Sequence, residues 1–148
     1  MNEPKEHDLT RFLDAQAGDF DVALQELVKG RKRSHWMWYI FPQVAGLGYS
    51  WMAEKYAIHS RGEAAAYLNH EVLGPRLRQC AAALLPHQDK SIAEIMSYPD
   101  NLKLRSSMTL FAAVAEPESV FAQVLGQFYA GEYDARTLRF LEANPSCS

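Results

Sequence analysis

The chain has 148 residues, of which 48% are apolar and 22% charged, and its formal net charge is −3. This composition is typical of a soluble globular protein, and the length favours one domain, expected over residues 1–148 with loose termini at 1–7 and 144–148. Nucleic-acid binders usually carry a basic surface, so the acidic balance argues against general nucleic-acid binding and requires any affinity for polyanions to be local.

The two cysteines, Cys80 and Cys147, lie far apart in the sequence. This spacing excludes a disulfide framework and favours a reduced, cytoplasmic protein. Residues 1–8 are polar, so we expect no signal peptide. No apolar run approaches the ~20 residues that cross a bilayer, and we expect no membrane contact.

Apolar residues recur at helical spacing through nearly the whole chain. A short helix beginning at Asp8 is expected to end at Gly18. A second helix, starting at Asp19 or Asp21, is expected to end at Gly30. The aromatic stretch that follows is rich in strand-forming residues, which leaves a short extended segment open.

The rest of the chain predicts further short helices separated by turn residues. Gly74-Pro75 is expected to kink or restart a helix over 70–85, and Pro117 is expected to begin a helix over 117–128. The side chains expected to cap helix starts are those of Ser50, Ser60, Ser91, Asp100 and Asp134. The predicted fold is a compact all-α bundle of about seven to nine short helices, with one irregular Gly/Pro loop over 42–50.

The segment 31–43 combines cations, an imidazole and aromatic rings in the sequence Arg-Lys-Arg-Ser-His-Trp-Met-Trp-Tyr-Ile-Phe-Pro-Gln. Arginine and lysine bind phosphate or carboxylate oxygens, and indole rings stack on planar ligands. A histidine can act as an acid or base near neutral pH, so we predict that His35 is catalytic. The ligand-binding residues predicted in this segment are Arg31, Lys32, Trp36, Trp38 and Gln43. Alternatively, the cations form a solvated helix start and the rings fill the core.

The segment 100–111 places three hydroxyl side chains close together, at Ser106, Ser107 and Thr109. Such side chains compete for the helix backbone, so they require either close packing against another helix or contact with a polar ligand. On the second interpretation we predict Ser106 as a further catalytic residue. The ligand-binding residues predicted in this segment are Lys103, Arg105 and Ser107.

Several familiar catalytic patterns are missing from the sequence. There is no Walker-type phosphate loop, no Gly-x-Ser-x-Gly elbow and no His-Glu-x-x-His pair. The histidines and cysteines do not occur in pairs at the spacing of metal ligands. We therefore expect no metal ion and no cofactor.

Two parts of the sequence resemble the hallmark motifs of the domain-of-unknown-function family numbered 1810. The first consists of residues 30–43 and 46–50, with Ala57 after Tyr56, and the second is Leu102-Lys-Leu-Arg-Ser-Ser-Met-Thr-Leu-Phe111. The resemblance extends from Asp8 to the last predicted helix. It implies a compact, all-helical and mostly bacterial soluble protein, supplies no established reaction, and suggests a loose association with domains that handle NAD-derived or ADP-ribosyl groups.

These observations support two hypotheses about function. In the first, the two segments face each other across a pocket that binds or hydrolyses a small phosphate-bearing ligand, such as a nucleotide or ADP-ribose derivative. In the alternative, the protein is a non-catalytic interaction module for an acidic protein or RNA partner. The sequence leaves open whether any reaction is catalysed. The hypotheses differ on whether His35, Trp36 and Trp38 border a cavity or lie in the core.

Overall fold

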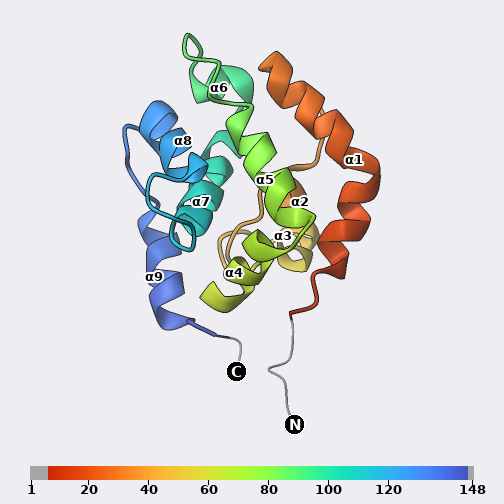
Figure 1. The fold of residues 1–148 in the computed structure, drawn as a ribbon, viewed down its shortest axis with the longest axis vertical. Coiled ribbons are helices and arrows are strands. Elements are labelled where there is room, and N and C mark those ends of the chain that lie inside the picture. Colours follow the sequence, from red (N-terminus) through yellow and green to blue (C-terminus); the bar gives the residue numbers. More distant parts are fainter. Residues whose placement is uncertain (1–6, 147–148) are drawn as a thin grey trace.

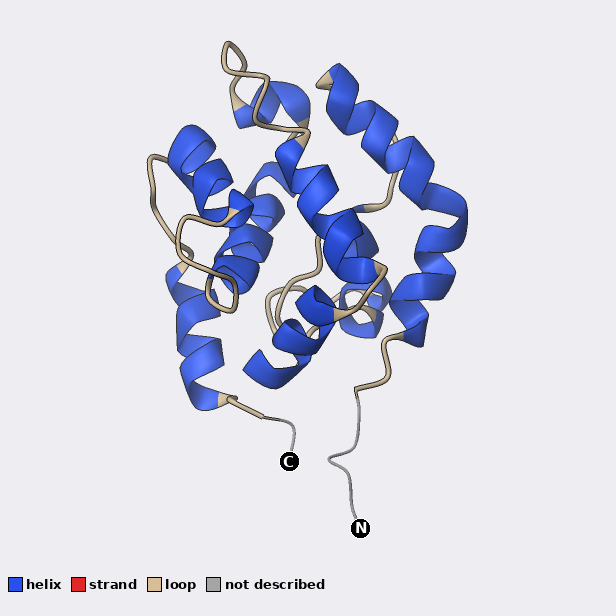
Figure 2. Cartoon of the chain, viewed as in Figure 1, coloured by secondary structure: helices blue, strands red, loops and turns tan. Residues whose placement is uncertain are grey.

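The computed structural model describes residues 7–146 of the chain. The predicted loose residues 1–6 and 147–148, and with them Cys147, lie outside the described part. Within that part the regular structure is entirely helical, which confirms the predicted all-α fold (Figures 1 and 2). The nine helices are α1 (Thr10–Lys29), α2 (Met37–Ile40), α3 (Trp51–Lys55), α4 (Arg61–Asn69), α5 (Leu73–Ala82), α6 (Ile92–Ile95), α7 (Asp100–Ala112), α8 (Val120–Tyr129) and α9 (Ala135–Ala143).

The helices pack around one core that joins the two sides of the molecule. Figure 1 shows α1 along one side, α8 and α9 along the other, and α5 and α7 between them. A row of fully buried rings crosses this arrangement through Phe12, Tyr67, Phe111 and Phe121, with neighbouring centroids 5.0, 5.3 and 5.9 Å apart. Each such ring pair adds about 0.5–1.5 kcal/mol beyond its burial. The row fixes α1, α4, α7 and α8 relative to one another.

Helix α1 runs without interruption through Gly18, so the predicted break at this glycine is wrong. A glycine inside a helix costs about 1 kcal/mol relative to alanine. That cost is outweighed because one face of α1 buries Phe12, Ala23 and Leu27 on both sides of Gly18. Tertiary packing therefore overrides the local preference.

The predicted end of α1 at Gly30 is confirmed. Gly30 has a left-handed conformation with φ of 80°, and its amide donates to Leu27 O. A Cβ at this position would lie 2.9 Å from Cε1 of His87. Both conformation and space therefore require glycine where the chain turns into the segment 31–43.

The extended alternative for the aromatic stretch is excluded, because Met37–Ile40 forms the short helix α2. Within the described residues, the only β-type pairing is an isolated parallel bridge between Val44 and Ile58. The loop over 42–50 is therefore irregular, as predicted, and returns the chain to α3.

Helix starts follow the predicted caps at four positions. The side chains that accept a hydrogen bond from the first turn are those of Ser50, Ser60, Ser91 and Asp134. At Ser91 the reciprocal bond from its own amide to the Glu94 carboxylate completes the capping box. These short polar patterns were reliable because each is satisfied within one turn of helix.

Of three further local expectations, the first is confirmed and the other two are wrong. Gly74-Pro75 lies in the first turn of α5, so the helix restarts there, and a Cβ on Gly74 would come within 2.0 Å of Leu68 O. Asp100 is the first residue of α7 rather than its cap, which leaves its carboxylate free for other contacts. Pro117 does not begin a helix, since α8 starts at Val120 with Ser119 as its cap.

Candidate functional site

One carboxylate on α1 organises the turn that follows it. Glu26 accepts hydrogen bonds from the Arg33 amide at 2.9 Å, the Ser34 amide at 3.0 Å and the Ser34 hydroxyl at 2.6 Å. It also accepts one from the Trp36 indole nitrogen at 2.9 Å. The four bonds wrap residues 33–36 around the end of α1 and turn the Trp36 ring into the core, where it is 1% exposed.

These bonds control the ionisation of Glu26. Desolvation by burial raises the pKa of a carboxyl group, but the hydrogen bonds from Ser34, Arg33 and Trp36 favour the charged form more strongly. Together they lower the pKa of Glu26 from 4.5 to about 2. The carboxylate is therefore fully charged whenever the turn is in place at neutral pH.

Lys32 fastens the same turn to α7. Its amide donates to Ile95 O at 2.7 Å, and its ammonium donates to Ser34 O at 2.6 Å. The ammonium also pairs with an Asp100 oxygen at 2.8 Å and lies 4.8 Å from the centroid of the Trp36 ring. The side chain is only 7% exposed. Lys32 therefore has little capacity left for a ligand in this arrangement.

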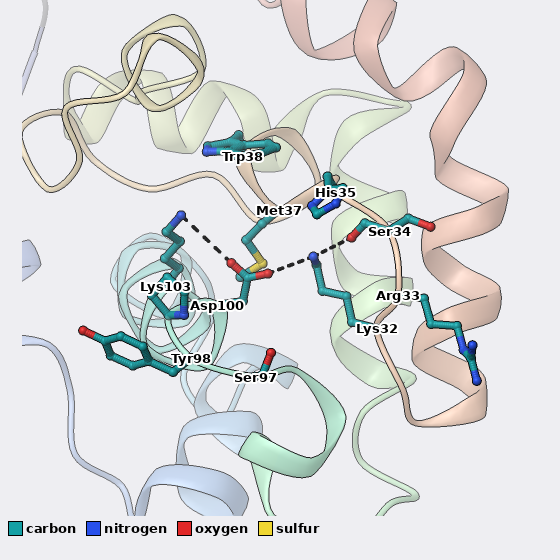
Figure 3. A pocket seen from close by; sticks show the side chains of 11 residues that line it. Lys32, Arg33, Ser34, His35, Met37, Trp38, Ser97, Tyr98, Asp100 and Lys103 are labelled. Carbon is teal, nitrogen blue, oxygen red and sulfur yellow. Dashed lines mark hydrogen bonds and ion pairs between the residues drawn. The ribbon is translucent and has the colours of Figure 1, made fainter.

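A hollow of about 310 Å³, here called the first hollow, opens beside this ion pair (Figure 3). Trp38 and His35 lie on one side of it, with Lys103, Asp100 and Lys32 opposite. The Lys103 ammonium is 4.0 Å from an Asp100 oxygen and 5.6 Å from the centroid of the Trp38 ring. The first hollow thus brings together residues of both sequence segments.

Two polar groups at the first hollow have no partner within residues 7–146. The Trp38 indole nitrogen is buried and makes no hydrogen bond. The exposed His35 imidazole likewise makes no hydrogen bond or ion pair to residues 7–146, since the Tyr39 hydroxyl donates to the backbone oxygen of His35 and not to its ring. Buried polar groups normally form hydrogen bonds, so the Trp38 indole N–H is an unsatisfied donor within the described residues.

A second hollow, of about 390 Å³, also borders Lys103. It is bordered by Gln43 and by the basic residues Arg105 and Arg136. Ser106 also borders it, and its hydroxyl donates to Asp134 at 3.2 Å. His35 and Ser106, the two predicted catalytic residues, therefore border different hollows, and only Lys103 among the predicted site residues borders both.

Hydroxyl groups of α7 serve packing between helices. Thr109 donates to Arg105 O at 2.9 Å and accepts from the Asp134 amide, also at 2.9 Å. With the bond from Ser106, this ties α7 to the start of α9. Ser107 is fully buried, and its hydroxyl has no partner within the described residues. The packing interpretation of these hydroxyls accounts for Ser106 and Thr109.

The remaining predicted ligand contacts lie apart from the two hollows. Trp36 and Ser107 are buried and border neither. Arg31 is exposed and borders a third hollow of about 390 Å³ together with Lys29 and Lys90. The third hollow adjoins the first at Arg33, which borders both.

The sequence profile of a protein family of unknown function, DUF1810, matches residues 6–141. The chain belongs to this family. Among solved structures, the DUF1810 chain is similar to the crystal structure of the conserved hypothetical protein Rv1873 from Mycobacterium tuberculosis. The two are 48% identical with a TM-score of 0.89, over 91% of this chain and 96% of that one. A comparison with curated proteins gave no match. No helix in the described part of the chain is long and apolar enough to cross a membrane.

In this DUF1810 protein two carboxylates matter that sequence reasoning did not assign to the site. Glu26 precedes the segment 31–43 by several residues, and its role depends on the chain reversing at Gly30. Asp100, expected to cap a helix, instead has its carboxylate between Lys32 and Lys103. A carboxylate in the first turn of α7, next to a segment rich in cations, was the available signal for Asp100.

Proposed function

We propose that the first hollow binds a small anionic ligand with a planar ring, such as a nucleotide or an ADP-ribose derivative. The observation that carries this proposal is that Lys103, His35 and the half-buried ring of Trp38 border one hollow. Its volume of about 310 Å³ lies at the lower end of the range for small-molecule sites, which suits a ligand of modest size.

Each group has a defined part in the proposed complex. The Lys103 ammonium supplies positive charge for a phosphate, and His35 adds a hydrogen bond from its free imidazole. The ligand's ring stacks on Trp38, whose unpartnered indole N–H can meet a polar atom of the ligand once the side chain adjusts. An incoming anion draws the ammonium away from the Trp38 ring and so exposes the ring face.

Binding without hydrolysis is the function that this geometry supports best. A hydroxyl nucleophile needs an adjacent base, and the two predicted catalytic residues border different hollows. The Ser106 hydroxyl already donates to Asp134. We therefore assign His35 to ligand binding and Ser106 to the packing of α7 against α9.

Thermal-shift measurements with AMP, ADP, ADP-ribose and inorganic phosphate test this proposal. A ligand that binds only the folded state raises its stability by about 1.4 kcal/mol at ten times its Kd, so the melting temperature should rise. Trp38→Leu and Lys103→Met should each abolish the rise.

The chain offers a matched control for these variants. Lys55 lies 5.1 Å from the centroid of the Trp51 ring, a pairing like that of Lys103 with Trp38, but Trp51 is 69% exposed and borders none of the three hollows. Trp51→Leu and Lys55→Met should keep the full rise. No rise with any of the four compounds, or an equal loss in both pairs of variants, would count against the proposal.

The excess of basic residues around the hollows favours a second candidate function, an interaction module for RNA or an acidic protein. A fourth hollow shares Lys32 with the first and Arg31 with the third, so all four are joined. Their basic residues outnumber their acidic ones by eight to four: Lys29, Arg31, Lys32, Arg33, Lys90, Lys103, Arg105 and Arg136 against Glu26, Glu94, Asp100 and Asp134. This local excess lies on a chain whose net charge is −3.

Fluorescence anisotropy with a single-stranded RNA and with an acidic peptide distinguishes the second candidate. Salt-sensitive binding that is lost when Arg31 and Arg33 are both changed to Glu would support it. The same double variant should leave the small-ligand thermal shift largely intact, because Lys103 and Trp38 remain. Unchanged RNA and peptide binding in the double variant would remove the basis for an interaction face.

A further inference from the structure

The first and second hollows are two parts of one surface along α7. Asp100 of α7 borders the first hollow, Ser106 of α7 borders the second, and Lys103 between them borders both. Tyr98 and Pro99, just before α7, are also shared. Six residues of α-helix separate Asp100 from Ser106, which corresponds to about 9 Å along the helix axis. A single phosphate group is too small to contact both ends of this surface.

The second hollow carries its own anion-binding chemistry. The Arg136 side chain is exposed and makes no hydrogen bond or ion pair within residues 7–146. The acid at this hollow, Asp134, uses one carboxylate oxygen to accept from Ser106 and Thr137. The Gln43 side chain also has no hydrogen bond to the described residues. Within the described residues, the Arg136 guanidinium and the Gln43 amide are therefore both unpaired at a hollow where one oxygen of the Asp134 carboxylate is engaged by Ser106 and Thr137.

The first hollow carries the other two groups that such a ligand would contact, an aromatic ring and a cation. Its cation, Lys103, also borders the second hollow, and the Lys103 ammonium lies 5.6 Å from the centroid of the ring of Trp38 across the first hollow. A ligand with one phosphate at Lys103 can extend from the first hollow into the second, because Lys103 borders both. The two hollows therefore suit the two ends of one elongated ligand.

We infer that the first and second hollows together bind a single nucleoside that carries two separate phosphate groups, one at each end of its sugar. This inference rests on the proposed function and specifies its ligand class. The ring stacks on Trp38 with one phosphate at Lys103, and Arg136 holds the second phosphate. A nucleoside 3′,5′-bisphosphate or a 5′-phosphorylated dinucleotide belongs to this class, whereas a nucleoside monophosphate fills only half of the site.

Calorimetric titration with AMP and with adenosine 3′,5′-bisphosphate tests the inference, because the two probes share ring and sugar and differ by one phosphate. We expect the bisphosphate to bind about tenfold more tightly, the effect of one added charge-assisted contact. Arg136→Gln should remove this advantage and leave AMP affinity unchanged. Arg139→Gln is the control, since Arg139 is exposed on the same helix and borders neither hollow.

The outcomes separate this inference from the proposed function. Equal affinity for the two probes would overturn the inference and leave the proposed function standing. A parallel loss of both affinities in Arg136→Gln, or a loss of the advantage in Arg139→Gln, would also overturn it, because Arg136 would then have no specific role at the second phosphate. If neither probe bound, both the inference and the nucleotide form of the proposed function would be wrong.

Discussion

The Glu26 carboxylate determines the shape of the turn over residues 33–36, here called the signature turn, because four donors from these residues converge on it. The ring of Trp36 is oriented by one of these bonds and is therefore a core residue, whereas Trp38, two positions later, borders the first hollow. Neighbouring tryptophans thus have different roles for a reason that lies outside their own segment.

Changing Glu26 to Gln should destabilise the protein by about 1–3 kcal/mol at neutral pH, because an amide cannot accept all four bonds and carries no charge. Urea unfolding measures this loss. The control is Asp14→Asn, an exposed site on the same helix, where a change within about 0.5 kcal/mol is expected. Equal effects at both positions would contradict the role of Glu26.

The same residue predicts a pH dependence. The pKa of Glu26 falls from its ordinary 4.5 to about 2 on folding, so the stabilisation it provides is complete above pH 4.5 and is lost as the pH falls toward 2. Unfolding curves of the wild type should therefore show a decline over this window that is shallower in Glu26→Gln. An identical decline in the two proteins would show that other groups control acid unfolding.

Adjacent serines of α7 should differ in how much their replacement by alanine changes the stability of the protein. Ser106→Ala removes the bond to Asp134 and should cost about 1 kcal/mol. Ser107→Ala removes a buried hydroxyl that has no partner in the described part of the chain, so it should be neutral or stabilise by up to about 1 kcal/mol. The melting temperatures of the two variants measure this difference. A large loss of stability in Ser107→Ala would contradict the account, because the hydroxyl would then have a bonding partner.

At the scale of elements, α7 connects the signature turn to the site, because its first residue, Asp100, pairs with the nearly buried Lys32. Breaking a buried pair costs about 3–5 kcal/mol, and the 22% exposure of Asp100 reduces this. A double-mutant cycle with Lys32→Met and Asp100→Asn should therefore give a coupling energy of about 1–3 kcal/mol. The control is the exposed Arg78–Glu116 pair, whose two hydrogen bonds are both 3.0 Å long. Its coupling energy should be less than about 1 kcal/mol.

Comparable coupling in the two pairs would show that burial of Lys32 has no energetic consequence. Near-zero coupling at Lys32–Asp100 would show that α7 and the signature turn are held together by other contacts, such as the bond from the Lys32 amide to Ile95.

Local sequence signals predicted those helix boundaries that local contacts determine. The caps at Ser91 and Asp134 and the stop at Gly30 are satisfied within a turn of helix, so they could be read directly. The break expected at Gly18 and the helix start expected at Pro117 failed. At Gly18, burial along both halves of α1 overrides the glycine's preference.

At the scale of the whole molecule, the basic segment does not act as one unit. Lys32 forms the ion pair with Asp100, Arg33 borders the first and third hollows, and Arg31 borders the third and fourth. The cations that complete the first two hollows, Lys103 and Arg136, come from distant parts of the chain. The sequence could indicate the chemistry of the site, but its partition into separate hollows depends on packing.

The three tryptophans allow the most direct measurement of ligand binding, because each has one indole N–H in a different environment. Trp36 donates to Glu26 in the core. Trp38 borders the first hollow and its indole N–H has no partner within residues 7–146, whereas Trp51 is 69% exposed and borders none of the four hollows. We would titrate ¹⁵N-labelled protein with AMP and follow the three indole cross-peaks. The Trp38 peak should move and saturate while those of Trp36 and Trp51 stay in place; a stationary Trp38 peak, or equal movement of all three, would contradict ligand binding at the first hollow.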